Sequence, residues 1–191
     1  SDVYKRQVFK LVEKNYNSDL VLRLAPTGYR VFPEYNLKKQ VSIMKALFSL
    51  GFPVPEVLFY EGNSSIIGYE FYIMNYIKGE APSDNPPYHL DPDGMMGRAD
   101  SEKRRNVWID WLFHLSNLHN LNLKDISLDD FCEEDINGNS VISDIEYYKN
   151  FLDWGMDGEP NNLCDDVIKW LKKNIPSDAK PNKLCWGDSR R

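Results

Sequence analysis

The sequence is poor in cysteine, in long apolar runs and, near its start, in glycine. Its three cysteines, Cys132, Cys164 and Cys185, are odd in number and widely spaced, so they suggest neither a disulfide framework nor a Cys-x-x-Cys metal site. No apolar run reaches the roughly 18 residues that a membrane-spanning helix needs, and the start lacks the pattern of a signal peptide. We therefore expect a cytoplasmic protein without a membrane partner. No glycine precedes Gly28, which excludes a glycine-rich phosphate loop from that part of the chain.

One region of the chain, residues 121–170, has few basic and many acidic side chains. The net charge is −6, and residues 121–170 carry 3 basic against 13 acidic side chains. This acidic region is either a solvated face that keeps the protein soluble or a surface that attracts a cationic substrate. In both cases the charge disfavours nucleic acid as a partner. The 191 residues, 42% of them hydrophobic, suffice for one large or two small domains with a real core.

Two strands are expected near the start of the chain, at residues 8–13 and 18–25. In the second strand Val21, Arg23 and Ala25 share one face, which sets a single cation among small apolar neighbours. Arg23 either extends from an edge strand to solvent or binds an anion on that face.

A helix is expected from Asn36, which can cap its first turn, to about Leu50, where Gly51 follows. Its apolar stripe contains one polar residue, Gln40, three positions after Leu37. By itself, Gln40 indicates a buried amide with satisfied hydrogen bonds or a residue at the margin of the stripe.

Two further strands, at residues 56–60 and 69–75, are followed by Gly79. Residues 81–99 are rich in proline, aspartate and glycine and are expected to form a loop, which is either a substrate-facing lid or an insertion without a role. Three helices are then expected, at residues 101–121 with Ser101 as the cap, 141–154 and 163–174. Strands followed by a mostly helical remainder indicate an α+β fold.

The last residues form a short polar turn after an apolar run. Leu184, Cys185 and Trp186 are compatible with a short buried strand, Gly187 allows a bend, and two arginines come soon after Asp188. On its own this pattern indicates either an ordinary surface turn or a catalytic loop in which Asp188 accepts or orients a proton.

Four stretches resemble the aminoglycoside phosphotransferase family, and especially a bacterial subgroup of it. They are Val-Leu-Arg at 21–23, Gly-Phe-Pro-Val-Pro at 51–55, Phe-Tyr-Ile-Met-Asn-Tyr-Ile-Lys-Gly-Glu at 71–80 and Trp-Gly-Asp-Ser-Arg at 186–190. The resemblance implies a two-lobed, protein-kinase-like α+β fold with an incomplete nucleotide-binding lobe at 8–77 and an incomplete helical lobe at 78–191. It also implies an enzyme that uses ATP and Mg²⁺ to phosphorylate a hydroxyl group of a small molecule. Some family members are fused to acyl-CoA dehydrogenase domains.

The resemblance assigns roles to single residues. Asp188 matches the carboxylate that accepts or orients the proton of the acceptor hydroxyl. Arg23 matches the strand lysine that binds nucleotide phosphates, and Val21 matches the residue that covers adenine. Gln40 matches the helix glutamate that pairs with the strand cation. Because glutamine cannot form an ion pair, we expect a hydrogen bond from Arg23 to Gln40.

The resemblance also places a hinge at Met74, Asn75, Tyr76 and Ile77, whose main chain is expected to pair with the adenine edge. His119 ends a Leu-x-x-Leu-His match to the family, and we expect it to be a core histidine hydrogen-bonded to the backbone of the catalytic loop; the alternative is a proton-transfer role.

Some positions depart from the family pattern. Gln40 replaces the helix glutamate and Trp186 replaces the loop histidine, so a nucleotide-binding pseudokinase without catalysis is the alternative. Residues 1–7 resemble adapter read-through and are set aside. The metal-binding residues of the family fall after Arg191, so we expect no metal ligand in this chain. The chain alone should then be inactive, with exposed apolar helix faces.

Overall fold

The computed structural model describes residues 8–11, 19–25, 32–122, 126, 140–177, 179 and 183–187. The chain divides into two compact units. The first comprises Ser1–Tyr76 and Ser127–Asn182, and the second comprises Ile77–Ile126 and Lys183–Arg191. The break after Tyr76 lies next to the expected lobe boundary, while the assignment of the remaining segments to lobes stays a prediction.

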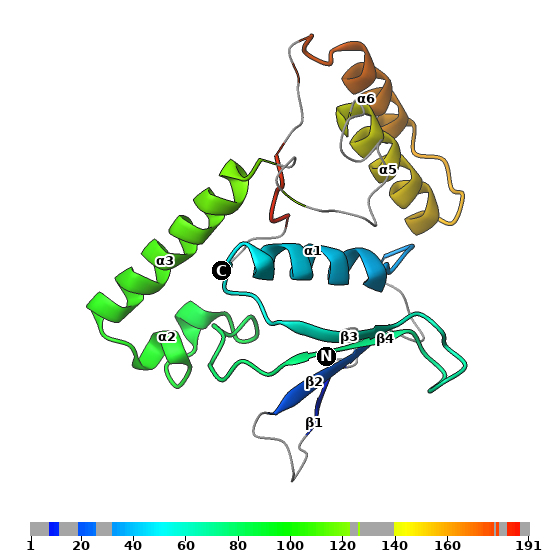
Figure 1. Cartoon of the computed structure of the whole chain (residues 1–191). Coiled ribbons are helices and arrows are strands. Elements are labelled where there is room, and N and C mark those ends of the chain that lie inside the picture. The colour runs from blue at the N-terminus through cyan, green and yellow to red at the C-terminus, as the bar shows by residue number, and fades with distance from the viewer. Residues whose placement is uncertain are drawn as a thin grey trace. The chain divides into compact units, whose positions relative to one another are not determined.

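Strands and helices are mixed as the α+β prediction requires (Figure 1). In chain order the elements are β1 (Val8–Leu11), β2 (Leu20–Leu24), α1 (Leu37–Ser49), β3 (Val57–Glu61), β4 (Phe71–Asn75), η2 (Tyr88–Leu90), α2 (Met95–Arg98), α3 (Ser101–Asn120), α5 (Ser140–Gly155) and α6 (Asn162–Lys173). No helix in the described part of the chain has both the length and the apolar character that crossing a membrane requires.

The four strands form one antiparallel sheet in the order β1-β2-β4-β3. Two central strands, β2 and β4, pair along their whole length from Leu20 opposite Asn75 to Leu24 opposite Phe71. The register of β3 shifts between Val57 and Phe59. β2 is therefore an interior strand, and the interpretation of Arg23 as a residue on an edge strand is wrong.

Helix α1 covers one face of this sheet and forms the core of the first unit with it (Figure 1). The buried cluster joins Leu37 and Val41 of α1 to Val57 of β3 and Tyr72 of β4. Tyr72 has no exposed surface at all. The alternation of strand side chains thus gives the sheet a face that packs against α1, here called the α1 face.

The ends of α1 lie where the sequence predicts them. The Asn36 side chain accepts a hydrogen bond from the main-chain N–H of Lys39 at 2.8 Å, which satisfies one of the unpaired donors of the first turn. Leu50 closes the helix, and Gly51 adopts a φ of +79°, a conformation that other residues reach only with strain.

Replacing Asn36 by alanine should lower the free energy of unfolding by about 1 kcal/mol, because the Lys39 N–H loses its acceptor. Urea unfolding of the chain measures this difference. Asn36→Asp keeps an acceptor and should retain most of the stability. Equal stability of the alanine variant and the parent would show that this cap contributes nothing.

The second unit contains two short helices inside the segment that we expected to be a loop. The carboxylate of Asp91 accepts the Gly94 N–H at 3.0 Å at the start of α2. Arg104 of α3 donates to the carbonyls of Met96 at 2.8 Å and Gly97 at 3.1 Å. The prediction of an irregular loop is wrong for this part, because an arginine from the following helix holds the turn in place.

The residue that caps helix α3 lies one position before Ser101, the predicted cap. The Asp100 side chain, and not that of Ser101, accepts the Lys103 N–H, at 2.8 Å. Leu118 is buried, whereas Leu112 and Phe113 are 54% and 59% exposed. The expected exposure of apolar surface on this helix is present.

Helices α5 and α6 lie side by side within the first unit (Figure 1). Lys172 of α6 forms an ion pair with Glu146 of α5, and Lys149 of α5 lies 3.7 Å from the Asp165 carboxylate of α6. Asn161 caps α6 by accepting the Cys164 N–H at 3.1 Å. Both helices agree with the predicted ranges.

Candidate nucleotide site

Three of the predicted site residues share the α1 face of the sheet. Val21 is paired with Met74, and Arg23 is paired with Tyr72, across the β2–β4 ladder. Directly opposed residues of an antiparallel pair project to the same side. Because Tyr72 belongs to the core beneath α1, Val21, Arg23 and Met74 lie on that face too. These three residues combine two apolar side chains with one cation.

Arg23 is half-buried and lies against an aromatic ring. Its guanidinium carbon is 5.6 Å from the centroid of the Tyr72 ring. This distance is within the range of a cation–π interaction. Tyr72 was not identified from the sequence, because only the register of β2 against β4 brings it beside Arg23.

Gln40 is also half-buried, next to the buried Val41 of α1. Among the described residues no hydrogen bond joins its side chain to that of Arg23. α1 packs against β3 and β4, whereas Arg23 lies on the next strand of the sheet. The Arg23–Gln40 hydrogen bond therefore stays a prediction.

A second cation, Lys10, lies on the same face, and the sequence does not single it out. Lys10 opposes Val21 across the β1–β2 pair. Its ammonium group is 2.5 Å from the Asp19 carboxylate and 4.3 Å from the centroid of the Tyr76 ring. The hydrogen bond to Asp19 raises the pKa of Lys10 above its ordinary value, so this side chain is charged at neutral pH. A lysine in a short strand gives no sequence signal of this pairing.

Two main-chain N–H groups of the hinge already donate hydrogen bonds within the first unit. The Asn75 N–H donates to the Glu56 carbonyl at 3.0 Å, and the Tyr76 N–H donates to the Asp19 carbonyl at 3.0 Å. Ile77 is the first hinge residue whose N–H makes no main-chain hydrogen bond to another described residue. Of the predicted hinge donors, it is the one that remains for a ligand.

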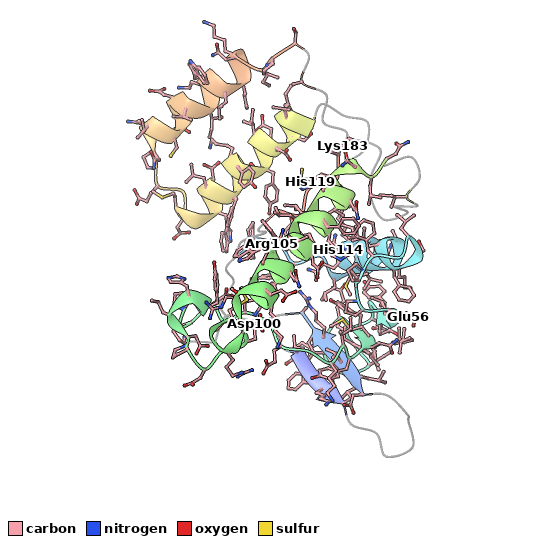
Figure 2. All side chains as sticks on the ribbon, turned by 90° about the vertical axis from the view of Figure 1, so that its left-hand side faces the viewer. Glu56, Asp100, Arg105, His114, His119 and Lys183 are labelled. Carbon is pink, nitrogen blue, oxygen red and sulfur yellow. The ribbon has the colours of Figure 1, made fainter. Side chains whose placement is uncertain are left out.

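The Asn75 side chain has a structural partner of its own. Its amide group donates to the carboxylate of Glu56 at 3.1 Å, and Figure 2 shows Glu56 on the segment that leads into β3. With the main-chain bond between the same two residues, this contact fixes the end of β4 to the start of β3. Asparagine at this hinge position thus stabilises the strand pair.

The C-terminal turn differs in part from its prediction. Leu184, Cys185 and Trp186 do not form a strand, and Trp186 is 48% exposed, so the expected buried strand is absent from the described structure. Gly187 has a φ of +79° and bends the chain as predicted. Asp188 lies outside the described residues, and its catalytic role stays a prediction.

His119 is exposed and not part of a core, so the prediction of a core histidine is wrong. Figure 2 shows it near one end of α3, with Asp100 at the other. Histidine in the last turn is compatible with the partial negative charge of a helix C-terminus. Its neighbour on the helix, Leu118, takes the buried position instead.

No group of three or more histidine, cysteine, aspartate or glutamate side chains that could hold a metal ion occurs in the described ranges. Within those ranges Cys164 and Cys185 are free thiols, as expected, while Cys132 lies outside them.

Comparisons with known proteins match the chain to a family model and to several relatives. The model of the phosphotransferase enzyme family matches residues 1–191. The acyl-CoA dehydrogenase family member 11 of Homo sapiens is 26% identical over 176 residues, which cover 89% of this chain and 20% of that protein. The mouse acyl-CoA dehydrogenase family member 10 is 28% identical over 172 residues, covering 90% of this chain and 15% of that protein.

A plant protein and a solved structure are similar as well. The probable acyl-CoA dehydrogenase IBR3 of Arabidopsis thaliana is 26% identical over 94% of this chain and 22% of its own length. A crystal structure from Ralstonia eutropha, solved as a candidate aminoglycoside phosphotransferase, covers 92% of this chain with a TM-score of 0.55 and 18% identity. This chain spans 49% of that structure and about a fifth of the length of the curated relatives. The likeness to the solved structure confirms the kinase-like α+β fold, and the match along the whole sequence shows that the chain belongs to the phosphotransferase enzyme family.

Proposed function

We propose that this chain provides the nucleotide-binding sheet, the hinge and the catalytic loop of an ATP-dependent enzyme that phosphorylates a hydroxyl group of a small molecule. The observation that carries this proposal is the arrangement of Val21, Arg23 and Met74 on one sheet face, in a chain that belongs to a phosphotransferase family. Apolar side chains suit a purine base, and a half-buried guanidinium suits phosphate oxygens.

The hinge offers a specific donor for the base. Because the N–H groups of Asn75 and Tyr76 are used within the first unit, the Ile77 N–H is the group that would donate to a ring nitrogen of adenine. The contact involves the main chain, so it does not depend on which side chain occupies this position.

Replacing Ile77 by proline should raise the Kd for ATP by about 3- to 10-fold, because proline has no N–H to donate. Isothermal calorimetry of the full-length protein with Mg·ATP measures the change. Ile77→Ala keeps the N–H and is the matched control, and the thermal midpoint shows whether both variants fold. Equal weakening by alanine and proline would mean that the side chain, and not the N–H, matters.

In the proposed reaction ATP supplies the γ-phosphoryl group. Arg23 would neutralise charge on the phosphates, and Asp188 would accept or orient the proton of the acceptor hydroxyl. The resemblance places the Mg²⁺ ligands after Arg191, and the described residues contain no group of three or more metal-ligating side chains, so we assign no step in this chain to the metal.

The acceptor is proposed only by class. A small hydroxyl compound fits the family, and the net charge of −6 argues against nucleic acid. We propose that the protein works on such compounds in the cytoplasm and without a membrane partner.

A second candidate function is nucleotide binding without catalysis. Gln40 carries no charge to pair with Arg23, and Trp186 stands in the place of the loop histidine. In this case the protein would bind Mg·ATP and transfer no phosphate.

One experiment separates the two functions. The full-length protein is incubated with Mg·ATP and a panel of hydroxyl acceptors, and ADP release is followed in a coupled assay while binding is measured by calorimetry. The proposed enzyme gives acceptor-dependent ADP release. Binding without any acceptor-dependent release supports the pseudokinase, and the absence of both contradicts nucleotide binding altogether.

A further inference from the structure

We propose that Tyr72 positions the strand cation, and that its ring takes the place of the helix carboxylate which Gln40 cannot supply. The proposal rests on the proposed function, because it assumes that Arg23 contacts the phosphates of ATP. It extends that function by naming a residue that acts through Arg23.

The first step of the argument is the pairing of the two residues. Arg23 and Tyr72 are directly opposed on β2 and β4, so the ladder places their side chains side by side on the α1 face. The guanidinium carbon lies 5.6 Å from the ring centroid. A planar guanidinium can stack on an aromatic face, which the compact ammonium group of lysine does less well.

The second step is that the ring itself is held firmly. Tyr72 is completely buried and packs with Leu37 and Val41 of α1. Its hydroxyl group also lies 3.8 Å from the sulfur of Met44, one turn further along the helix. The ring beside Arg23 is therefore anchored to α1.

The third step concerns charge. The guanidinium of Arg23 stays protonated beside either kind of partner, so the two kinds differ in the charge that they add next to it. A ring can orient the guanidinium through its negative face without adding a charge, whereas a carboxylate would add one negative charge beside the phosphates. Arginine on the strand, glutamine on the helix and a buried tyrosine between β2 and α1 are then consistent with a cation that is oriented by a ring and not by a carboxylate.

The test changes the electrostatics of the ring while keeping its shape. Tyr72 is replaced by phenylalanine and by 3,4,5-trifluorophenylalanine in the full-length protein, and the KM for ATP and kcat are measured with a saturating hydroxyl acceptor. Phenylalanine keeps the ring and should leave KM within about twofold of the parent. Fluorination weakens the negative face, so KM for ATP should rise about fivefold relative to phenylalanine with little change in thermal midpoint.

Phe71 provides the matched control. It is the preceding residue of β4, it is buried, and its side chain lies on the opposite face, where its ring is 5.9 Å from that of Phe59. The same fluorination at Phe71 should leave the KM for ATP unchanged. Equal KM values for the phenylalanine and trifluorophenylalanine variants at position 72, or equal effects at 71 and 72, would overturn the proposal.

A second readout is independent of ATP. The ring current of Tyr72 should shift the NMR signals of the Arg23 side-chain protons upfield in the 191-residue chain, and Tyr72→Leu should remove this shift. If the protein binds no ATP while the shift is present, the proposed function fails and the contact stands. If the shift is absent from a folded parent chain, the positioning role fails even when ATP binds.

Discussion

Replacing Asp188 by asparagine in the full-length protein should lower kcat for phosphoryl transfer by roughly 10²- to 10⁴-fold. The amide has the size of the carboxylate but cannot accept the proton of the acceptor hydroxyl. The Kd for Mg·ATP should change by less than about threefold, because the family role of this residue is toward the acceptor and not toward the adenine. Single-turnover assays with the acceptor and calorimetry with ATP measure the two quantities separately.

The nearby Ser189 supplies a control for this experiment. Ser189→Ala changes the next residue along the chain, leaves the carboxylate in place and should retain most of the activity. An Asp188→Asn protein with more than a tenth of the parent kcat would remove this residue from the proton-transfer step. It would also favour the nucleotide-binding module without catalysis.

Replacing Arg23 by alanine should lower kcat/KM for ATP by roughly 10- to 100-fold and weaken ATP binding together with turnover. Arg23 is the cation on the α1 face that opposes Tyr72, and it lies two residues from Val21 on the same strand. In the proposed function, its removal would take away a charge-assisted contact to the phosphates in both the ground state and the transition state. Steady-state kinetics with varied ATP and a fixed acceptor concentration measure the change.

Two further variants separate the effect of charge from that of stacking, and the effect of Arg23 from that of Lys10. Arg23→Lys keeps the charge but loses the planar stacking on Tyr72, so its kcat/KM should lie between those of the alanine variant and the parent. Lys10→Ala removes the other cation of this face, which is already paired with Asp19, and should have a smaller effect. Unchanged kinetics of Arg23→Ala would exclude Arg23 from the nucleotide site.

The local features of the fold could be predicted from the sequence because they depend on near neighbours along the chain. Asn36 and Gly51 mark the two ends of α1 through a cap three residues away and a left-handed turn. The alternation in β2 placed Val21 and Arg23 on one face. One prediction failed where a contact from the following helix decided the outcome, because Arg104 of α3 holds the short helix α2 inside an expected loop.

In the candidate site, too, some features follow from the sequence and others only from the tertiary structure. The chain itself determined the residue types: an arginine on a strand, a glutamine on the following helix, an asparagine in the hinge and a Gly-Asp pair. The tertiary structure decided which of these meet. It placed Arg23 against Tyr72 and used the Asn75 and Tyr76 N–H groups within the sheet. Strand register depends on hydrogen bonds between residues about 50 positions apart in the sequence, and neither composition nor periodicity carries that information.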